Sequence, residues 1–264
     1  MTIYPHERHT MKFQKASCFR DEFDLFALFS YTWLTNFDYL MTLRKTFVLL
    51  YCLFVLFLSC STVEIVDKPI EFDEQRTELS LDYLRTRYNL EKSEPVIEPQ
   101  MIVVHWTAIP TLEESFEAFK DPLLPNTRPD ITSAGALNVS AHFLIDQDGT
   151  IYRLMPETTM ARHVIGLNHC AIGIENVGGT DGTPLTRKQL RSNIKLVKYL
   201  KEKYPEIEYL IGHLEYTRFE GHPLWLEVDD SYRTEKTDPG VDFIDKIRLE
   251  TSDFNWNPLP PKNE

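Results

Sequence analysis

The hydrophobic positions of the chain form several short runs with strand-like spacing. Residues 101–104 are apolar at every position, which is typical of a central strand buried on both faces. Two β-rich runs, 141–145 and 150–154, flank a short turn containing Asp and Gly, and this pattern predicts a hairpin. Residues 170–175 and 207–211 are predicted as two further strands.

Two segments show helical spacing instead. Leucine and tyrosine side chains on one side of residues 74–88 predict an amphipathic helix. A second helix is predicted to begin at Thr186, because Gln189 follows it at capping-box distance and an apolar stripe then continues to Pro205. Mixed in this order, the elements predict an α/β fold with a central mixed β-sheet of about five strands packed by helices.

Composition and charge exclude some classes of partner. The formal net charge is −12 at pH 7, although residues 1–59 contain six basic and five acidic side chains, so the acidity belongs to the rest of the chain. Nucleic acids and anionic membranes are bound by clustered Lys and Arg, so we expect no nucleic-acid partner. Of the four cysteines only Cys170 lies within residues 98–250, which predicts neither a disulfide framework nor a zinc ribbon.

Residues 44–60 have the pattern of a secretion signal. Two basic residues precede the apolar run 46–58, which is too short for a comfortable membrane span of roughly 20 residues. Residues 57–60 resemble a bacterial lipobox, apart from Phe57 at its first position, and the resemblance implies that Cys60 carries the lipid. An uncleaved anchor and a buried helix are the alternatives.

Three candidate metal ligands lie at strand ends or in adjoining loops, namely His105, His213 and Asp238. Two neutral imidazoles and a carboxylate form a common catalytic zinc set, which leaves the fourth position for a water whose pKa falls to roughly 7. Each residue alone is weak evidence, because most histidines are surface or core residues. Their placement at rigid strand ends favours a metal site.

Six short strings resemble, in the same order, the motifs of a known family. They are VVHWTA (103–108), VSAHFLIDQDGTIYRLMPE (139–157), ARH (161–163), IGIENVG (172–178), IGH (211–213) and KTDPG (236–240). On this ground the chain from about residue 98 to residue 245 is similar to the type 2 N-acetylmuramoyl-L-alanine amidases. These share a fold with phage amidase lysozymes and animal peptidoglycan recognition proteins.

The resemblance implies a role for each matched residue. His105, His213 and Asp238 would hold Zn²⁺, Glu175 would act as the acid and base, and Lys236 would stabilise the oxyanion. Amide hydrolysis needs such groups, because its amine leaving group is poor and its intermediate carries negative charge. Simpler interpretations stay open, in which Glu175 is a solvated strand residue and Lys236 pairs with an acidic neighbour.

The sequence is less specific about the roles of the remaining histidines and the cysteine. His142 is expected to be structural, and His163 and His169 are candidates for lining a substrate groove. His222 is expected to be a loop residue. Cys170 is most simply a small buried hydrophobic residue.

Residues 214–235 separate the second and third candidate ligands by an unusually long loop. Its aromatic and cationic side chains can either grip sugar and stem-peptide carboxylates or seal a sheet edge. They are Arg218, Phe219, Trp225, Tyr232 and Arg233.

The segments together predict an exported enzyme. They are an upstream extension (1–40) before a favoured start at Met41, a lipoprotein signal peptide (41–59), a tether with a helix (60–97), an amidase domain (98–250) and a tail (251–264). The expected reaction is hydrolysis of the bond between N-acetylmuramic acid and L-alanine of peptidoglycan or muropeptides, in wall remodelling or recycling. The expected location is the cell envelope, with the lipid in the outer membrane facing the periplasm. The rivals are a non-cutting peptidoglycan-binding module, whose relatives tend to lose a zinc ligand, and a zinc hydrolase of another amide.

Overall fold

The computed structural model describes residues 41, 44–45, 63–125, 132 and 134–261. The chain divides into two units, Met1–Thr62 and Val63–Glu264, and the fold below is that of the second unit. The predicted signal run and Cys60 lie outside the described residues. No helix in the described part of the chain is both long enough and apolar enough to cross a bilayer.

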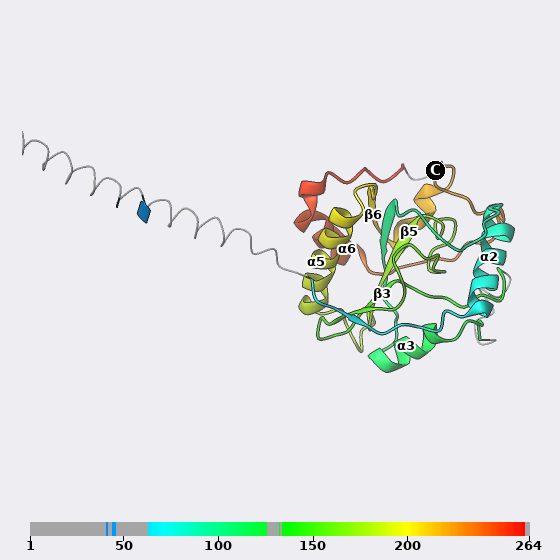
Figure 1. The fold of residues 1–264 in the computed structure, drawn as a ribbon, viewed down its shortest axis with the longest axis horizontal. Coiled ribbons are helices and arrows are strands. Elements are labelled where there is room, and N and C mark those ends of the chain that lie inside the picture. Colours follow the sequence, from blue (N-terminus) through cyan, green and yellow to red (C-terminus); the bar gives the residue numbers. More distant parts are fainter. Residues whose placement is uncertain (1–40, 42–43, 46–62, 126–131, 133, 262–264) are drawn as a thin grey trace, which may run out of the picture. The chain divides into compact units, whose positions relative to one another are not determined.

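A six-stranded mixed sheet forms the centre of this unit (Figure 1). Its strands in spatial order are β1 (Ile65–Asp67), β4 (Ile151–Arg153), β3 (Phe143–Ile145), β5 (Ala171–Asn176), β2 (Met101–Val104) and β6 (Tyr209–Gly212). All neighbours pair in parallel except β3 and β4, which form the predicted antiparallel hairpin. The sheet has one strand more than the sequence predicted, and the additional strand is β1.

Strand β1 escapes prediction because it is only three residues long. Such a run carries no measurable period, and its extended form depends on its pairing with β4. It lies in the segment that we predicted to be a tether.

The central strands bury both faces, as the apolar run over β2 predicts. Met101 and Val103 belong to one hydrophobic cluster, while Ile102 and Val104 belong to another. This alternation follows from the two-residue period of a strand. The sheet therefore separates two cores, each of which needs its own helical cover.

The helices divide between these two faces. The first face is covered by α2 (Glu74–Tyr88), whose Tyr83 and Leu84 join the cluster of Met101. The second is covered by α5 (Arg187–Lys203) and α6 (Val241–Glu250). Figure 1 shows α2 on one side of the strands and α5 with α6 on the other.

The two predicted helices are confirmed. Helix α2 has the predicted bounds, and Asp73 accepts a hydrogen bond from the Arg76 amide as its N-cap. At the start of α5, Thr186 accepts from the Gln189 amide at 3.1 Å while Gln189 accepts from the Thr186 amide at 2.8 Å. Each side chain thereby satisfies a backbone donor that a helix start leaves unpaired.

The remaining helical elements were not predicted. Helix α3 (Leu112–Lys120) begins after Thr111, and the short 3₁₀ helices η1 (His213–Phe219) and η2 (Ser252–Phe254) follow β6 and α6. The start of η1 matters for the site, because it lies at the candidate ligand His213.

Candidate metal centre

Adjacent parallel strands bring the first two candidate ligands together. His105 directly follows β2 and His213 directly follows β6, and the pairing of Val104 with Gly212 places them side by side at the same sheet edge. Asp238 arrives from the long loop before α6. Its carbonyl oxygen accepts a hydrogen bond of 2.8 Å from the Leu214 amide, which fixes this segment against η1.

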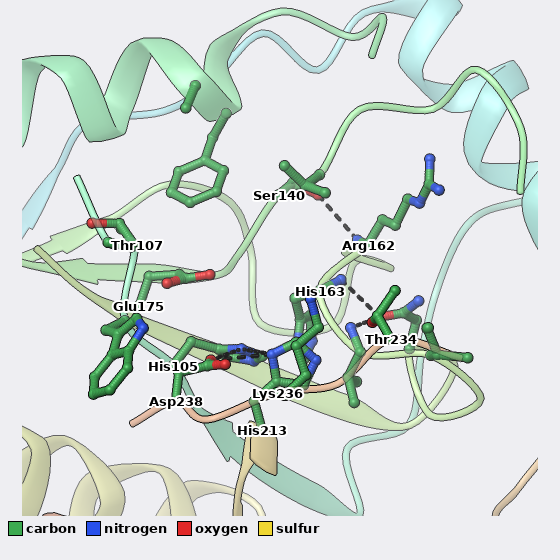
Figure 2. Close-up of a pocket in the computed structure, with 18 of the residues that line it drawn as sticks. His105, Thr107, Ser140, Arg162, His163, Glu175, His213, Thr234, Lys236 and Asp238 are labelled. Atoms are coloured by element: carbon green, nitrogen blue, oxygen red, sulfur yellow. Dashed lines mark hydrogen bonds and ion pairs between the residues drawn. The ribbon is translucent and has the colours of Figure 1, made fainter. Parts of the chain in front are cut away.

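The donor atoms of the three residues form a small triangle (Figure 2). His105 Nδ1 lies 3.0 Å from His213 Nδ1, and Asp238 Oδ2 lies 3.2 Å from the first nitrogen and 3.1 Å from the second. Ligands bound tetrahedrally to zinc at 2.0–2.1 Å are separated by about 3.3 Å. The triangle therefore has nearly the dimensions that a zinc ion requires.

The electrostatics of this triangle also suit a cation. Burial, together with the neighbouring His105, lowers the pKa of His213 to about 4, so the ring is neutral at neutral pH. Burial opposes ionisation of Asp238, but the adjacent His213 holds the pKa of this carboxyl well below its usual range. Neutral imidazoles and an ionised carboxylate are the forms that bind metal, so the residues fit zinc.

A cavity of about 260 Å³ opens over the triangle. Glu175, on strand β5, and Lys236, two residues before Asp238, both line it. Only 8% of Glu175 is exposed, so the interpretation as a solvated strand residue is wrong. In the described part of the chain no ion pair joins Lys236 to Glu235 or Asp238. The interpretation that Lys236 merely pairs with an acidic neighbour is therefore wrong as well. Figure 2 shows the Glu175 carboxylate on one side of the three candidate ligands.

The structure separates the other histidines into different roles. His142 is buried and structural, since its Nε2 donates to the Thr159 carbonyl at 2.8 Å and its Nδ1 accepts from the Gly173 amide at 2.9 Å. His163 lines the cavity, whereas His169 does not and packs edge-on against Tyr88.

Two further expectations from the sequence are confirmed. His222 lies away from the cavity, where its ring contacts the Tyr209 hydroxyl at 3.3 Å. Cys170 is 1% exposed, and burial raises the pKa of its thiol to about 12, so it behaves as a small apolar side chain.

The side chains of the long loop divide between the protein interior and the cavity. Phe219 is fully buried in the core, and Arg218 donates to the Pro260 carbonyl at 2.7 Å. Trp225 stacks with Tyr216 and contacts the Arg233 guanidinium. By contrast, Tyr232 lines the cavity.

Several cavity residues were not singled out from the sequence. Arg162 lies in the matched string ARH, but its neighbours come from distant segments: its guanidinium donates to the Leu137 carbonyl and, at 3.3 Å, to the Tyr232 hydroxyl. Tyr83 of α2 also lines the cavity, although its spacing indicated only a core position. Neither role has a local sequence signal.

The chain is similar to several solved structures. The chain is 24% identical to the N-acetylmuramoyl-L-alanine amidase LysC from Clostridium intestinale, with a TM-score of 0.45 over 72% of this chain and 99% of that one. It is 19% identical to bumblebee PGRP-SA, with a TM-score of 0.45 over 75% of this chain and 100% of that one. It is also 19% identical to human PGRP-IBETAC, solved with glycosamyl muramyl pentapeptide, with a TM-score of 0.41 over 58% and 85% of the two chains.

No curated protein matches the chain significantly. The family model described as N-acetylmuramoyl-L-alanine amidase matches residues 94–241, a range that contains all three candidate ligands together with Glu175 and Lys236. Because this match spans more than half of the chain, the chain belongs to the N-acetylmuramoyl-L-alanine amidase family.

Proposed function

We propose that this chain is a zinc-dependent amidase that hydrolyses the bond between N-acetylmuramic acid and the L-alanine of a peptidoglycan stem. The observation that carries the proposal is the triangle of His105, His213 and Asp238 donor atoms at the floor of a cavity, within a domain of the amidase family. Zinc held by these three residues would supply a water of lowered pKa and polarise the scissile carbonyl.

The other cavity residues supply the proton transfers and the charge stabilisation. Glu175, which lines the cavity, would accept the proton of the attacking water and return it to the amine that leaves. Lys236, which also lines the cavity, would stabilise the negative oxygen of the tetrahedral intermediate, which forms as the water adds to the carbonyl. A partly buried cation and a buried carboxylate act more strongly there than in water, because the local dielectric constant is lower.

The experiment that tests this function is digestion of purified peptidoglycan by the soluble protein, residues 61–264, with products identified by mass spectrometry. We expect free stem peptides that begin with L-alanine, their loss after treatment with a chelator, and their recovery on adding zinc. A pure binding module would hold the wall without releasing peptides. Full activity of the metal-free protein would contradict the mechanism.

The proposal includes a place in the cell envelope. The basic pair, the apolar run 46–58 and the lipobox-like ending at Cys60 support a lipid anchor, which we assign to the outer membrane facing the periplasm. There the enzyme would remodel the wall or recycle its fragments.

Labelling with a radioactive fatty acid in a bacterial host tests the anchor. The Cys60→Ala variant should carry no label, whereas Cys52→Ala, which changes a cysteine inside the apolar run, should be labelled like the wild type. Label that persists on Cys60→Ala would show that another residue carries the lipid.

A further inference from the structure

His163 contacts the ring of His105 on the edge opposite the metal triangle. His105 points its Nδ1 at His213 and Asp238, while its Nε2 lies 3.0 Å from His163 Nδ1. The two rings are perpendicular, with an interplanar angle of 90° and centroids 5.1 Å apart. Both side chains are buried, so water does not compete strongly for this contact.

The direction of this hydrogen bond can be worked out from its far end. His163 Nε2 lies 3.2 Å from the backbone carbonyl oxygen of Ala171, and a carbonyl oxygen only accepts. His163 Nε2 must therefore carry a hydrogen. A neutral imidazole has one N–H, so His163 Nδ1 has a lone pair and accepts from His105.

The direction of this hydrogen bond determines which nitrogen of His105 is free to bind a metal. If His105 donates through Nε2–H, its single hydrogen is used, and its Nδ1 carries the lone pair that faces the triangle. We infer that His163 is a positioning residue that holds His105 in the one tautomer able to bind zinc. This inference rests on the proposed zinc site, and it concerns the chain's own hydrogen atoms before any metal binds.

The structure holds the His163 ring firmly enough for this role. A Cβ atom at Gly173 would lie 2.8 Å from His163 Cγ, so the ring packs directly on the backbone of β5 at a position where only glycine leaves room. The backbone of His163 is held as well, because Asn168 Oδ1 accepts hydrogen bonds of 2.8 Å from the amides of both His163 and Val164. The ring of His163 is therefore fixed by its packing on β5 and by the hydrogen bonds that hold its backbone.

A different role for His163 would be direct contact with substrate, because it also lines the cavity. That role would alter the KM and leave zinc affinity unchanged. The positioning role instead alters zinc affinity and the tautomer of His105, and neither quantity requires substrate. The two roles are therefore separable by measurement.

The first measurement is ¹⁵N NMR of the histidine side chains in the metal-free protein, with assignment by comparison with a His105→Gln variant. We expect His105 to carry its hydrogen on Nε2 and His163 to carry its hydrogen on Nε2. A hydrogen on His105 Nδ1 would overturn the inference without any variant of His163.

The second measurement is zinc affinity, determined by competition with a chromophoric chelator. His163→Phe keeps a ring of similar shape but removes the acceptor, which leaves His105 Nε2–H buried without a partner. We expect zinc to bind 10- to 100-fold more weakly, the usual effect of losing a residue that orients a ligand. His163→Asn places Oδ1 near the position of Nδ1, so it should recover most of the affinity.

The matched control is His169→Phe, since His169 is a half-buried histidine of the same segment that lies outside the cavity. It should bind zinc like the wild type. Unchanged affinity in a folded His163→Phe, verified by circular dichroism, would overturn the inference. Failure of the wild-type protein to bind zinc would instead refute the proposed function, and the tautomer measurement would still decide the role of His163.

Discussion

At the scale of single residues, the candidate ligands and the candidate catalytic groups have different environments. His105 and His213 meet Asp238 within hydrogen-bond distance, whereas Glu175 and Lys236 line the cavity outside this triangle. Removing a ligand should therefore remove the metal, while removing a catalytic group should leave the metal in place.

This difference predicts that zinc content and turnover separate. Glu175→Gln and Lys236→Ala should retain one zinc per chain and slow turnover about 100-fold or more, because each removes assistance to the transition state. Zinc is measured by atomic absorption and turnover by release of L-alanyl peptides. Loss of stoichiometric zinc from either variant would mean that a ligand has been misassigned.

The matching pair of histidine variants completes this test. His213→Ala should lose both zinc and turnover, because its Nδ1 is one corner of the triangle. His222→Ala should keep both, since His222 lies in the loop beside Tyr209. The reverse pattern in metal content would exclude the site described above.

The residues that could be predicted are those with a local signal. His105 and His213 each directly follow an apolar strand, and the strings around them match the family motifs. The contact of His163 with His105 and the contact of Arg162 with Tyr232 join segments far apart in the chain. Such contacts depend on how the strands are ordered in the sheet, which no short window of sequence specifies.

At the scale of elements, α2 holds the long loop in place. Arg87 near the end of α2 forms a buried ion pair with Glu227, at 2.7 Å, and its guanidinium lies 4.6 Å from the centre of the Tyr232 ring. The Glu227 side chain is fully buried, and burial raises the pKa of its carboxyl despite the attraction of Arg87. This pair therefore connects α2 to a wall of the cavity.

Arg87→Met should consequently reduce both stability and substrate binding. It leaves the Glu227 carboxylate buried without its cation, which typically costs about 3 kcal/mol of unfolding free energy. The KM should rise more than kcat falls, because Tyr232 lines the cavity and the metal triangle is untouched. Urea unfolding and steady-state kinetics measure the two effects.

The control for this variant lies two residues away in the same helix. Arg85 pairs with Asp82, but both side chains are more than half exposed, so Arg85→Met should change stability by less than about 0.5 kcal/mol. Equal effects of the two substitutions would show that the Arg87 pair does not hold the loop.

The elements that could be predicted are those with enough residues to show a period or a cap. Helices α2 and α5 span 15 and 17 residues, and the capping box marks the start of α5. Helix α6 begins after Gly240 with no side-chain cap, and α3 has only nine residues. Their helical form depends on burial against the sheet, which becomes visible only in the assembled structure.

At the scale of the whole molecule, the region that matches the family model is only part of the folded unit Val63–Glu264. The family match begins at residue 94, but β1 and α2 precede it and contribute a sheet strand and part of one core. Tyr83 of α2 even reaches the cavity. Residues 63–93 are therefore part of the folded structure around the site.

Two histidines, one buried and one half-buried, make the stability of this unit depend on pH. Burial lowers the pKa of His142 to about 4, and burial, with the charge of Lys92, lowers the pKa of His169 to about 4 as well. The unfolded chain binds these protons with a pKa of about 6.5, so between pH 6.5 and pH 4 it binds more protons than the folded chain. The stabilisation is therefore complete above pH 6.5 and is lost as the pH falls towards 4, by about 3 kcal/mol for each such histidine.

His169→Phe isolates one of these contributions. The variant has no proton to bind at this position, so its unfolding free energy should fall less steeply with acid than that of the wild type. Relative to the wild type it should gain up to about 3 kcal/mol between pH 7.5 and pH 4, measured by urea unfolding at each pH. The metal triangle and His142 are common to both proteins, so their own acid sensitivity cancels in the difference. A difference that stays constant across this range would mean that His169 has a similar pKa in the folded and unfolded chains, and that its burial against Tyr88 does not keep it neutral.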